Sequence, residues 1–365
     1  MKNVLIIRNA YKYDFGGAEM HALNLSISLK KQGFRPILVT RVPILLERSA
    51  ENKIETIKGI WYSNQGWGRF YKFFGWFLVL WYLFILKIKH IDVLHAHSRD
   101  DFVFATTAAK ILKIKTVWTD HADLKYVMEK HNSPDLRGRI VELARYASRV
   151  IAVSNSEKSE ILERYKFFPN LEVINNGVFL PKTINKIDKP KKIIIGVTNR
   201  LVTSKGIGEL IEAYSKIKKL YETQLWIVGD GPEKEKFIDL ARALRIGENV
   251  KFLGYQRDVW RYLYAFDIYI QPTYHEAFSN SLIEASMAGC AVIATETGGN
   301  PEIINTKNGI LVPVKDSEAI TKAIDSYISN PADMKRKSTL LKKYAIKNYN
   351  FDKIVKEKVI PIYEN

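Results

Sequence analysis

The sequence predicts an α/β protein with two domains, each built on a doubly wound parallel sheet. Short apolar runs typical of buried strands alternate with helical patterns, which indicates βαβ units. The alternation stops at residues 181–192, which are rich in Lys and Pro, and restarts with a new strand pattern at 193–197. The length of 365 residues also suits two domains. Ligands of such sheets bind outside the carboxyl ends of the strands, so the loops there are the expected functional segments.

The first half opens with VLII at 4–7, a buried-strand pattern, followed by a loop that contains Gly16 and Gly17. A helical pattern then runs from 18 to 31 and stops before Gly33. Further strands are predicted at 36–40, 93–96, 116–119 and 150–154, and helices at 102–112 and 137–148.

Residues 73–86, FFGWFLVLWYLFIL, form an uninterrupted apolar run flanked by lysines. As a helix it would measure about 21 Å, against roughly 30 Å for a bilayer core, so a transmembrane span is disfavoured. We favour a buried or partly exposed helix of the first domain. The alternative is an in-plane helix docked on a membrane, because Trp and Tyr residues between 67 and 82 are typical of the membrane interface.

The second half repeats the α/β rhythm. Its predicted elements are strands at 193–197, 225–228, 250–253, 268–271, 291–294 and 310–312, with helices at 206–219, 233–244 and 258–265.

The net charge is +17, with +10 in residues 1–180 and +7 in the rest. No zinc-finger spacing, RNP-like segment or dense basic arm accompanies this charge, so a nucleic-acid partner is disfavoured. An anionic membrane surface, a phosphate-bearing substrate and a merely solvated basic surface remain open. The single cysteine, Cys290, lies in an apolar run and is expected to be a buried, inert thiol in a reduced cytoplasmic setting. The apolar run at 4–7 is too short for a secretory signal.

The most informative segment is HEAFSNSLIEASMAG at 275–289, in which Glu276 and Glu284 stand eight residues apart. The polar residues Ser279, Asn280 and Ser281 open a helical pattern and offer cap chemistry. Because the first amides of a helix lack intrahelical partners, they form an anion site. Two carboxylates on either side of an anion site suit a ligand with central phosphates and terminal hydroxyls, such as a sugar nucleotide.

Basic residues mark the start of the second domain. Arg200 and Lys205 follow its first strand and precede a glycine-containing helix start, so they could bind one diphosphate. A Walker loop is absent, which disfavours nucleotide hydrolysis. Gly229 opens another turn after a strand, where a structural role is equally open.

Among the histidines, His121 follows a strand directly and, with Asp120, is a candidate for contacting a polar substrate. His95 and His97 would point to opposite faces of a continued strand, so they are not expected to chelate a metal. No HExxH, CxxC or carboxylate cluster indicates a metal site, and no GxSxG elbow indicates an acyl hydrolase.

Taken together, these motifs resemble the family-four retaining glycosyltransferases of the GT-B fold, over nearly the whole chain. The most specific match is the E-x7-E element at 276–284 with the following G-x-A-V-I-A-T…G-G-N-P-E run at 289–302. The other matching motifs, in order, are GGAE at 16–19, DVLHAHS at 92–98, TDHA at 119–122, VIAVS at 150–154, NNGV at 175–178, NRLVTSKG at 199–206 and VGDGPE at 228–233. Cys290–Ala291 departs from the family, which usually has a proline near this point.

The resemblance implies an acceptor-binding Rossmann-like domain at 1–182, a donor-binding one at 183–347, and a final helix at 348–365 that returns to the first domain. The donor would be a nucleotide-diphosphate sugar, with UDP favoured over GDP-mannose. The acceptor would be a glycan or lipid-linked glycan of cell-surface polysaccharide synthesis, handled at the inner face of the membrane.

The resemblance also implies residue roles. Arg200 and Lys205 would neutralise the diphosphate without a metal, and no separate cofactor is expected. Glu276 and His121 would contact the transferred sugar, and Glu284 the ribose. The remaining implied donor contacts are Gly16 and Gly17 and the Phe278–Ser281 amides at the phosphates, with Gly229 and Gly254 in the segments beside the base. Alternatives are a sugar-nucleotide epimerase of the same fold and a non-catalytic glycan or nucleotide-sugar binder.

Overall fold

The protein consists of two compact units in the computed structural model, Met1–Asn176 with Phe351–Asn365, and Gly177–Asn350. We call these unit 1 and unit 2. The sequence predicts domain boundaries after residues 182 and 347. The structure describes residues 1–9, 16–60, 70–97, 99–121, 134–166, 168–185 and 187–364, without the side chains of 70–74, 99–101 and 134–137.

Unit 1 contains a seven-stranded parallel sheet in the order β3-β2-β1-β4-β5-β6-β7. Its central strands are fully buried apolar runs, as expected for a sheet covered on both faces. The strands are β1 (Asn3–Ile7), β2 (Arg35–Thr40), β3 (Glu55–Lys58), β4 (Val93–Ala96), β5 (Lys115–Asp120), β6 (Arg149–Ala152) and β7 (Leu171–Val173).

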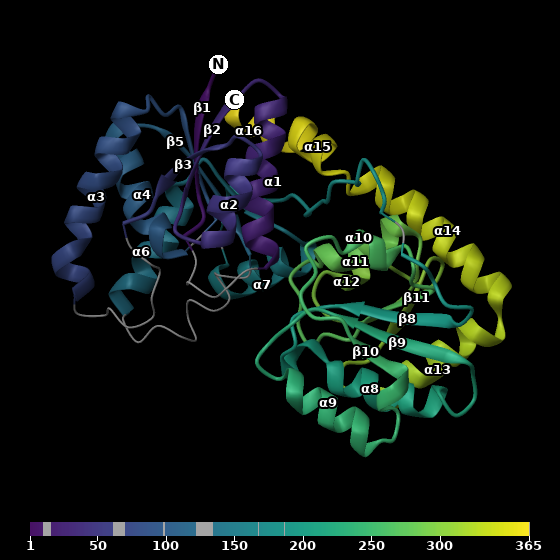
Figure 1. The fold of residues 1–365 in the computed structure, drawn as a ribbon. Coiled ribbons are helices and arrows are strands. Elements are labelled where there is room, and N and C mark those ends of the chain that lie inside the picture. The colour runs from purple at the N-terminus through teal and green to yellow at the C-terminus, as the bar shows by residue number, and fades with distance from the viewer. Residues whose placement is uncertain are drawn as a thin grey trace. The chain divides into compact units, whose positions relative to one another are not determined.

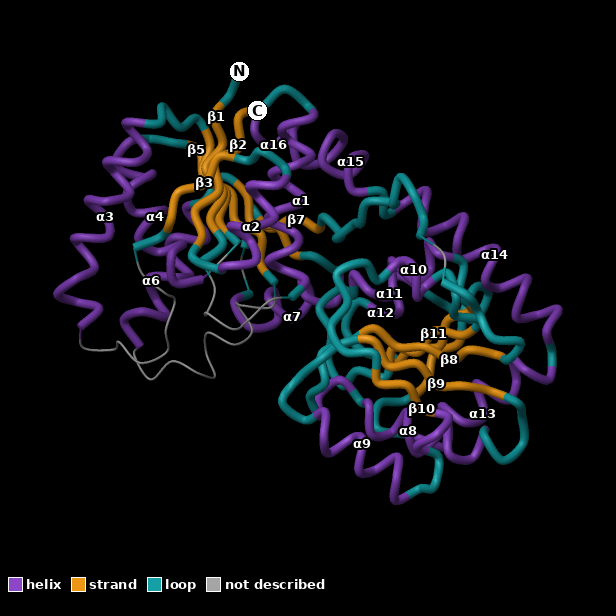
Figure 2. The backbone as a smooth tube through the Cα atoms, in the orientation of Figure 1, coloured by secondary structure: helices purple, strands orange, loops and turns teal. Residues whose placement is uncertain are grey.

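Helices lie on both faces of this sheet (Figures 1 and 2). Two of them, α3 and α4, pack together over the strands β1, β2 and β4. The helices of unit 1 that precede unit 2 in the chain are α1 (Gly17–Lys31), α2 (Pro43–Glu51), α3 (Phe70–Ile88), α4 (Arg99–Leu112), α6 (Pro134–Tyr146) and α7 (Asn155–Tyr165). The apolar run at 73–86 is therefore a helix of the first domain, as favoured from the sequence.

Unit 2 contains a six-stranded parallel sheet in the order β10-β9-β8-β11-β12-β13. Figure 2 shows its strands between two layers of helices, with α8, α9 and α13 on one face. The strands are β8 (Ile193–Thr198), β9 (Thr223–Val228), β10 (Val250–Phe252), β11 (Ile268–Gln271), β12 (Ala291–Thr295) and β13 (Ile310–Val312). The helices are α8 (Ile207–Ile217), α9 (Lys234–Ala243), α10 (Trp260–Leu263), α11 (Asn280–Ala288), α12 (Asn300–Ile303), α13 (Ser317–Ser329) and α14 (Pro331–Asn348), with short 3₁₀ turns at Thr203–Lys205 and Gly247–Asn249.

The last segment of the chain returns to unit 1, as the family resemblance implied. It comprises α15 (Phe351–Ile354), a π-helical turn (Val355–Val359) and α16 (Ile360–Glu364). Asp352 accepts a hydrogen bond from Ser28 in α1, at 2.7 Å, and the Tyr363 side chain is buried in the unit. Two doubly wound α/β units with a returning C-terminal segment confirm the predicted fold class.

Candidate functional site

In unit 2, the strand order places the expected site between β8 and β11. The chain runs from β8 outward to β9 and β10, then crosses back to β11 on the other side of β8. Ligands of doubly wound sheets bind at the carboxyl edge where the strand order reverses in this way. Lys205 and Glu276 lie in the two loops that leave these strands, and their side chains form an ion pair, with 2.7 Å between Nζ and Oε2.

Backbone contacts hold the two loops together. The Tyr274 amide donates to the Ser204 carbonyl at 2.9 Å, and the Thr273 hydroxyl donates to the same oxygen at 3.3 Å. Gly206 has φ +66°, and a Cβ there would lie 2.0 Å from the Pro272 carbonyl oxygen. Only glycine fits such a close backbone approach, so the position of Lys205 relative to Glu276 is fixed by the main chain.

The loop after β12 supports Glu276 from the other side. The Gly299 amide donates to the Glu276 carbonyl at 3.2 Å, and the Thr297 hydroxyl donates to the Tyr274 carbonyl at 3.2 Å. Gly298 has φ +51°, and a Cβ there would lie 1.7 Å from the Glu276 carbonyl oxygen. Three consecutive strands of the sheet, β8, β11 and β12, thus deliver loops that converge on Glu276.

The start of α11 follows directly. Ser279 is the N-cap, and its hydroxyl accepts a hydrogen bond from the Leu282 amide at 3.2 Å. The Phe278 ring is buried against Tyr349, with 5.5 Å between centroids, so only its backbone can face a ligand. The buried Oδ1 of Asn280 has no hydrogen-bond partner among the described residues. The first amides of this helix, up to Ser281, lie where the sequence predicts an anion site.

Glu284 lies in α11 and is mostly buried. Burial raises the pKa of its carboxyl from 4.5 to about 7. Within the described ranges, no hydrogen bond is recorded for this carboxyl group. Its oxygens are not among the buried side-chain atoms that lack a partner, so they still reach solvent, and a bound ligand could donate hydrogen bonds to them.

Polar residues of β8 and β11 were not singled out in the sequence. The Tyr269 hydroxyl donates to Gln271 Oε1 at 2.8 Å and lies 3.2 Å from the Thr198 hydroxyl. The buried Gln271 Nε2 has no partner in the part of the chain that the structure describes. The available signal was a glutamine at the end of an otherwise apolar strand, IYIQ.

The remaining predicted residues of unit 2 occupy neighbouring loops. Arg200 is exposed in the loop after β8, before the 3₁₀ turn that carries Lys205. Gly229, at φ +137°, donates its amide to the Gly254 carbonyl at 2.8 Å. A Cβ on Gly229 would lie 1.8 Å from the Asn199 carbonyl oxygen, so this glycine has a structural role whether or not it meets a ligand.

In unit 1, the corresponding reversal of strand order lies between β1 and β4. Four histidines gather at this edge of the sheet, namely His21, His95, His97 and His121. The rings of His95 and His97 stack with 4.4 Å between centroids. His97 Nδ1 lies 3.2 Å from His121 Nε2.

The expectation that His95 and His97 point to opposite faces is wrong. Side chains alternate along a strand, so residues two positions apart share a face, and the His95 and His97 rings accordingly stack on the same side. His21, which was not singled out in the sequence, reaches the group from α1, and its ring centroid lies 5.2 Å from that of His121.

Burial keeps the four histidines neutral. It lowers the pKa of His21 to about 4 and that of His95 to about 3. The pKa values of His97 and His121 also lie well below 6.5, through burial and then through neighbouring positive charge. His97 Nε2 is buried without a described partner, and an unpaired acceptor costs less than an unpaired donor. The proton of His97 is therefore assigned to Nδ1, which donates to His121.

Gly16 and Gly17 begin α1 and are exposed. The Gly16 amide donates to Glu19 Oε2 at 2.8 Å, and Glu19 also accepts from Arg8 Nε at 2.7 Å. Arg8 in turn donates to the His97 carbonyl oxygen. One buried carboxylate thus links the glycine pair to the histidine group.

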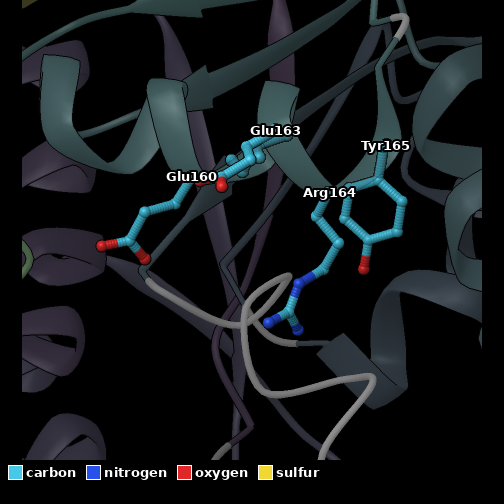
Figure 3. Close-up of a pocket in the computed structure, with 5 residues that line it drawn as sticks. Glu160, Glu163, Arg164 and Tyr165 are labelled. Carbon is cyan, nitrogen blue, oxygen red and sulfur yellow. The ribbon is translucent and has the colours of Figure 1, made fainter.

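A separate hollow of about 400 Å³ lies along α7 in unit 1. Figure 3 shows its lining, in which the Arg164 and Tyr165 side chains extend on one side and Glu160 on the other. None of the predicted site residues lines it. In the described parts of the chain, no group of three or more His, Cys, Asp or Glu residues is arranged to hold a metal ion. Cys290 is buried, and burial raises the pKa of its thiol to about 12, as expected for an inert cysteine.

Known proteins share this sequence and this architecture. The family described as "Glycosyltransferase Family 4" matches residues 15–180, and the family "Glycosyl transferases group 1" matches residues 181–348. An uncharacterized glycosyltransferase of Haemophilus influenzae is 29% identical over 64% of this chain and 69% of its own length. An N-acetyl-alpha-D-glucosaminyl L-malate synthase of Bacillus anthracis is 29% identical over 65% of both chains. This chain thus spans about two thirds of the length of these relatives.

Among solved structures, HepE of Anabaena in complex with UDP matches with a TM-score of 0.83 and 20% identity, and each chain is covered to 100%. At this identity the likeness concerns the fold, two doubly wound domains of the GT-B type. The two families together account for nearly the whole sequence, and the boundary between their matches, at residues 180 and 181, lies four residues beyond the end of the first segment of unit 1 at Asn176. On these grounds the chain belongs to the family-four glycosyltransferases of the GT-B fold, and it is an enzyme of the glycosyltransferase class.

Proposed function

We propose that the enzyme transfers a sugar from a UDP-sugar to a glycan or lipid-linked acceptor, with retention of the anomeric configuration. Support for the donor comes from the similar structures of HepE in complex with UDP and with UDP-glucose. The acceptor class and a role in cell-surface polysaccharide synthesis rest on the family resemblance and remain predictions, as does the cytoplasmic location.

The observation that carries the donor assignment is the Glu284 carboxyl group. It is mostly buried, it has no hydrogen-bond partner among the described residues, and it follows the capped N-terminus of the same helix. The two hydroxyls of a ribose would donate hydrogen bonds to this carboxyl group. The distal phosphate would accept hydrogen bonds from the amides at the start of α11. A nucleotide fits this order of groups because its ribose and phosphates are adjacent.

Lys205 is proposed to exchange its partner when the donor binds. In the structure its ammonium pairs with Glu276 at 2.7 Å. A diphosphate would attract Lys205 and Arg200, and Glu276 would then accept hydrogen bonds from hydroxyls of the transferred sugar. Positive charge at the diphosphate stabilises the leaving group as its negative charge develops. We expect these two side chains to supply this charge without a metal ion.

The reaction is proposed to be a front-side displacement. The acceptor oxygen attacks the anomeric carbon on the face from which the phosphate departs, and its proton passes to the departing phosphate oxygen. One carbon–oxygen bond forms and one breaks, so the products are the glycoside and UDP. In unit 1, Gly16 and Gly17 are proposed to approach the phosphates, and His121, held in one tautomer by His97, to contact the sugar.

The first experiment is a donor screen on the full chain. UDP-glucose, UDP-galactose, UDP-N-acetylglucosamine and GDP-mannose are compared by thermal shift and by nucleotide release. We expect UDP compounds to stabilise the protein and GDP-mannose not to. NMR of the product would report the anomeric configuration, and EDTA should leave the rate unchanged.

Variants test the residue roles. Lys205→Ala and Glu276→Ala should each lower transfer by 10²-fold or more, on the order of the loss of one transition-state contact. Lys219→Ala, a change of an exposed lysine in the same unit, serves as the matched control. If both variants transferred sugar at the rate of this control, the assignment of Lys205 and Glu276 would be wrong.

A further inference from the structure

The outer face of α3 is an exposed apolar stripe. Its members are Trp76, Phe77, Leu80, Phe84 and Ile88, with exposed fractions of 66%, 62%, 60%, 61% and 55%. On an ideal helix, at about 100° per residue, these side chains fall within an arc of about 120°. Contiguous apolar surface of this kind is unusual on a soluble protein and marks an interaction site.

The opposite face of α3 is fixed in the core. Val79, Tyr82, Ile85 and Leu86 are each 5% exposed or less and pack against α4 and the sheet. Figure 1 shows α3 beside α4 on one face of the unit 1 sheet. A helix held along one side in this way can immerse only its outer half. Among the described residues there is also no helix that is long and apolar enough to cross a bilayer.

The surroundings of the stripe are basic. Residues 70–118, which contain α3 and α4, include six lysines and one arginine against three aspartates, a net charge of +4, and Lys89 pairs with Glu55 at 2.8 Å. Lys87 lies on the stripe side of α3 and is exposed, as are Lys110 and Lys113 near the end of α4. Aromatic side chains together with lysines are the composition of interfacial helices that bind anionic lipid.

We propose that the α3 stripe docks unit 1 on an anionic lipid bilayer, with α3 lying in the plane of the membrane. Trp76, Phe77 and Phe84 enter the boundary between headgroups and acyl chains, and the lysines contact lipid phosphates. The inference deepens the proposed function, because such docking would bring a lipid-linked acceptor to the enzyme, but the docking itself requires no donor.

The test is co-sedimentation of the full chain with vesicles of phosphatidylcholine alone or with phosphatidylglycerol added. We expect binding to the anionic vesicles and at least tenfold weaker binding to the neutral ones. The triple variant Phe77→Gln, Leu80→Gln, Phe84→Gln should bind about a hundredfold more weakly, since three large apolar groups no longer leave water. The matched control is Leu220→Gln with Leu340→Gln, which removes exposed leucines from unit 2.

Two double variants that reverse lysine charges test the electrostatic part of the proposal. Lys87→Glu with Lys110→Glu should reduce binding to anionic vesicles, whereas Lys219→Glu with Lys343→Glu should change it less. Circular dichroism and the UDP-induced thermal shift of each variant show that folding and donor binding persist, so a failed lipid result is separable from a failed donor assignment. Equal binding of the triple variant and its control, or no binding by the unchanged protein, refutes the proposal. Dimerisation that the triple variant abolishes, without lipid binding, refutes it in favour of a second copy as the occupant.

Discussion

Replacing Glu284 by Gln should stabilise the free enzyme at pH 8 and weaken its binding of UDP. The carboxyl is mostly buried, and its pKa is raised from 4.5 to about 7 by burial. Above pH 7 the folded protein must hold this group as a carboxylate in an environment that disfavours charge. An amide of nearly the same shape carries no such charge.

The magnitude follows from the pKa. A group whose pKa is higher in the folded state binds its proton more tightly there, so the free energy of unfolding falls as pH rises from 4.5 to about 7. At about 1.4 kcal/mol per pKa unit, this change corresponds to about 3 kcal/mol as an upper limit. Glu284→Gln should recover up to this amount above pH 7 and nothing near pH 4. For a domain of this size the gain is roughly 5–10 °C in Tm.

The assay is thermal unfolding of the variant and the unchanged protein at pH 8 and pH 4.5, with UDP titration by calorimetry. Glu212→Gln, a change of an exposed glutamate in α8, is the control. UDP affinity should fall about tenfold or more in Glu284→Gln, because an amide accepts ribose hydroxyls less well than a carboxylate. A stability gain that is equal at both pH values, or a UDP affinity equal to that of the control, would contradict the reasoning.

Three further outcomes are expected. Gly298→Ala should destabilise unit 2 by about 2 kcal/mol or more and reduce transfer, because its Cβ would lie 1.7 Å from the Glu276 carbonyl oxygen. The control is Gly254→Ala, at φ +67° with no neighbour within 4 Å, which measures the backbone strain alone when both variants are unfolded thermally. His21 has a pKa of about 4 when folded, so its share of stability is present above pH 6.5 and lost as pH falls towards 4; His21→Leu should remove about 3 kcal/mol of that acid sensitivity in a pH series of unfolding curves. Tyr363→Phe, which removes the hydroxyl bonded to a buried histidine, should lower the stability of unit 1 by about 1–2 kcal/mol in chemical denaturation, and an unchanged midpoint would contradict the role of this bond.

The sheet strands of both units were predictable because their apolar runs are short and bounded by glycine or polar residues. Elements with weaker patterns were not predicted, among them β3, whose residues are half-exposed or exposed, and the long polar helix α14. Local pattern does not reveal a strand that is stabilised mainly by its neighbour in the sheet.

The site shows a similar limit. The Glu276–Glu284 segment predicts a helix start with an anion site, and the structure has a capped helix there. The ion pair between Lys205 and Glu276 joins residues 71 positions apart, and their proximity depends on β8 and β11 being neighbours. The grouping of His21 with His97 depends equally on tertiary packing, since one residue lies in a helix and the other follows a strand. Such contacts cannot be inferred from the spacing of residues along the chain.

The returning C-terminal segment has a consequence for how the protein is made. Unit 2 is continuous in sequence, whereas unit 1 is completed only by Phe351–Asn365. During synthesis, all of unit 2 leaves the ribosome before the segment that buries Tyr363 against unit 1. Because domains generally fold as units, unit 2 can finish folding first although it begins second. Unit 1 can therefore complete its core, in which Tyr363 lies beside His95, only after unit 2 has been synthesised.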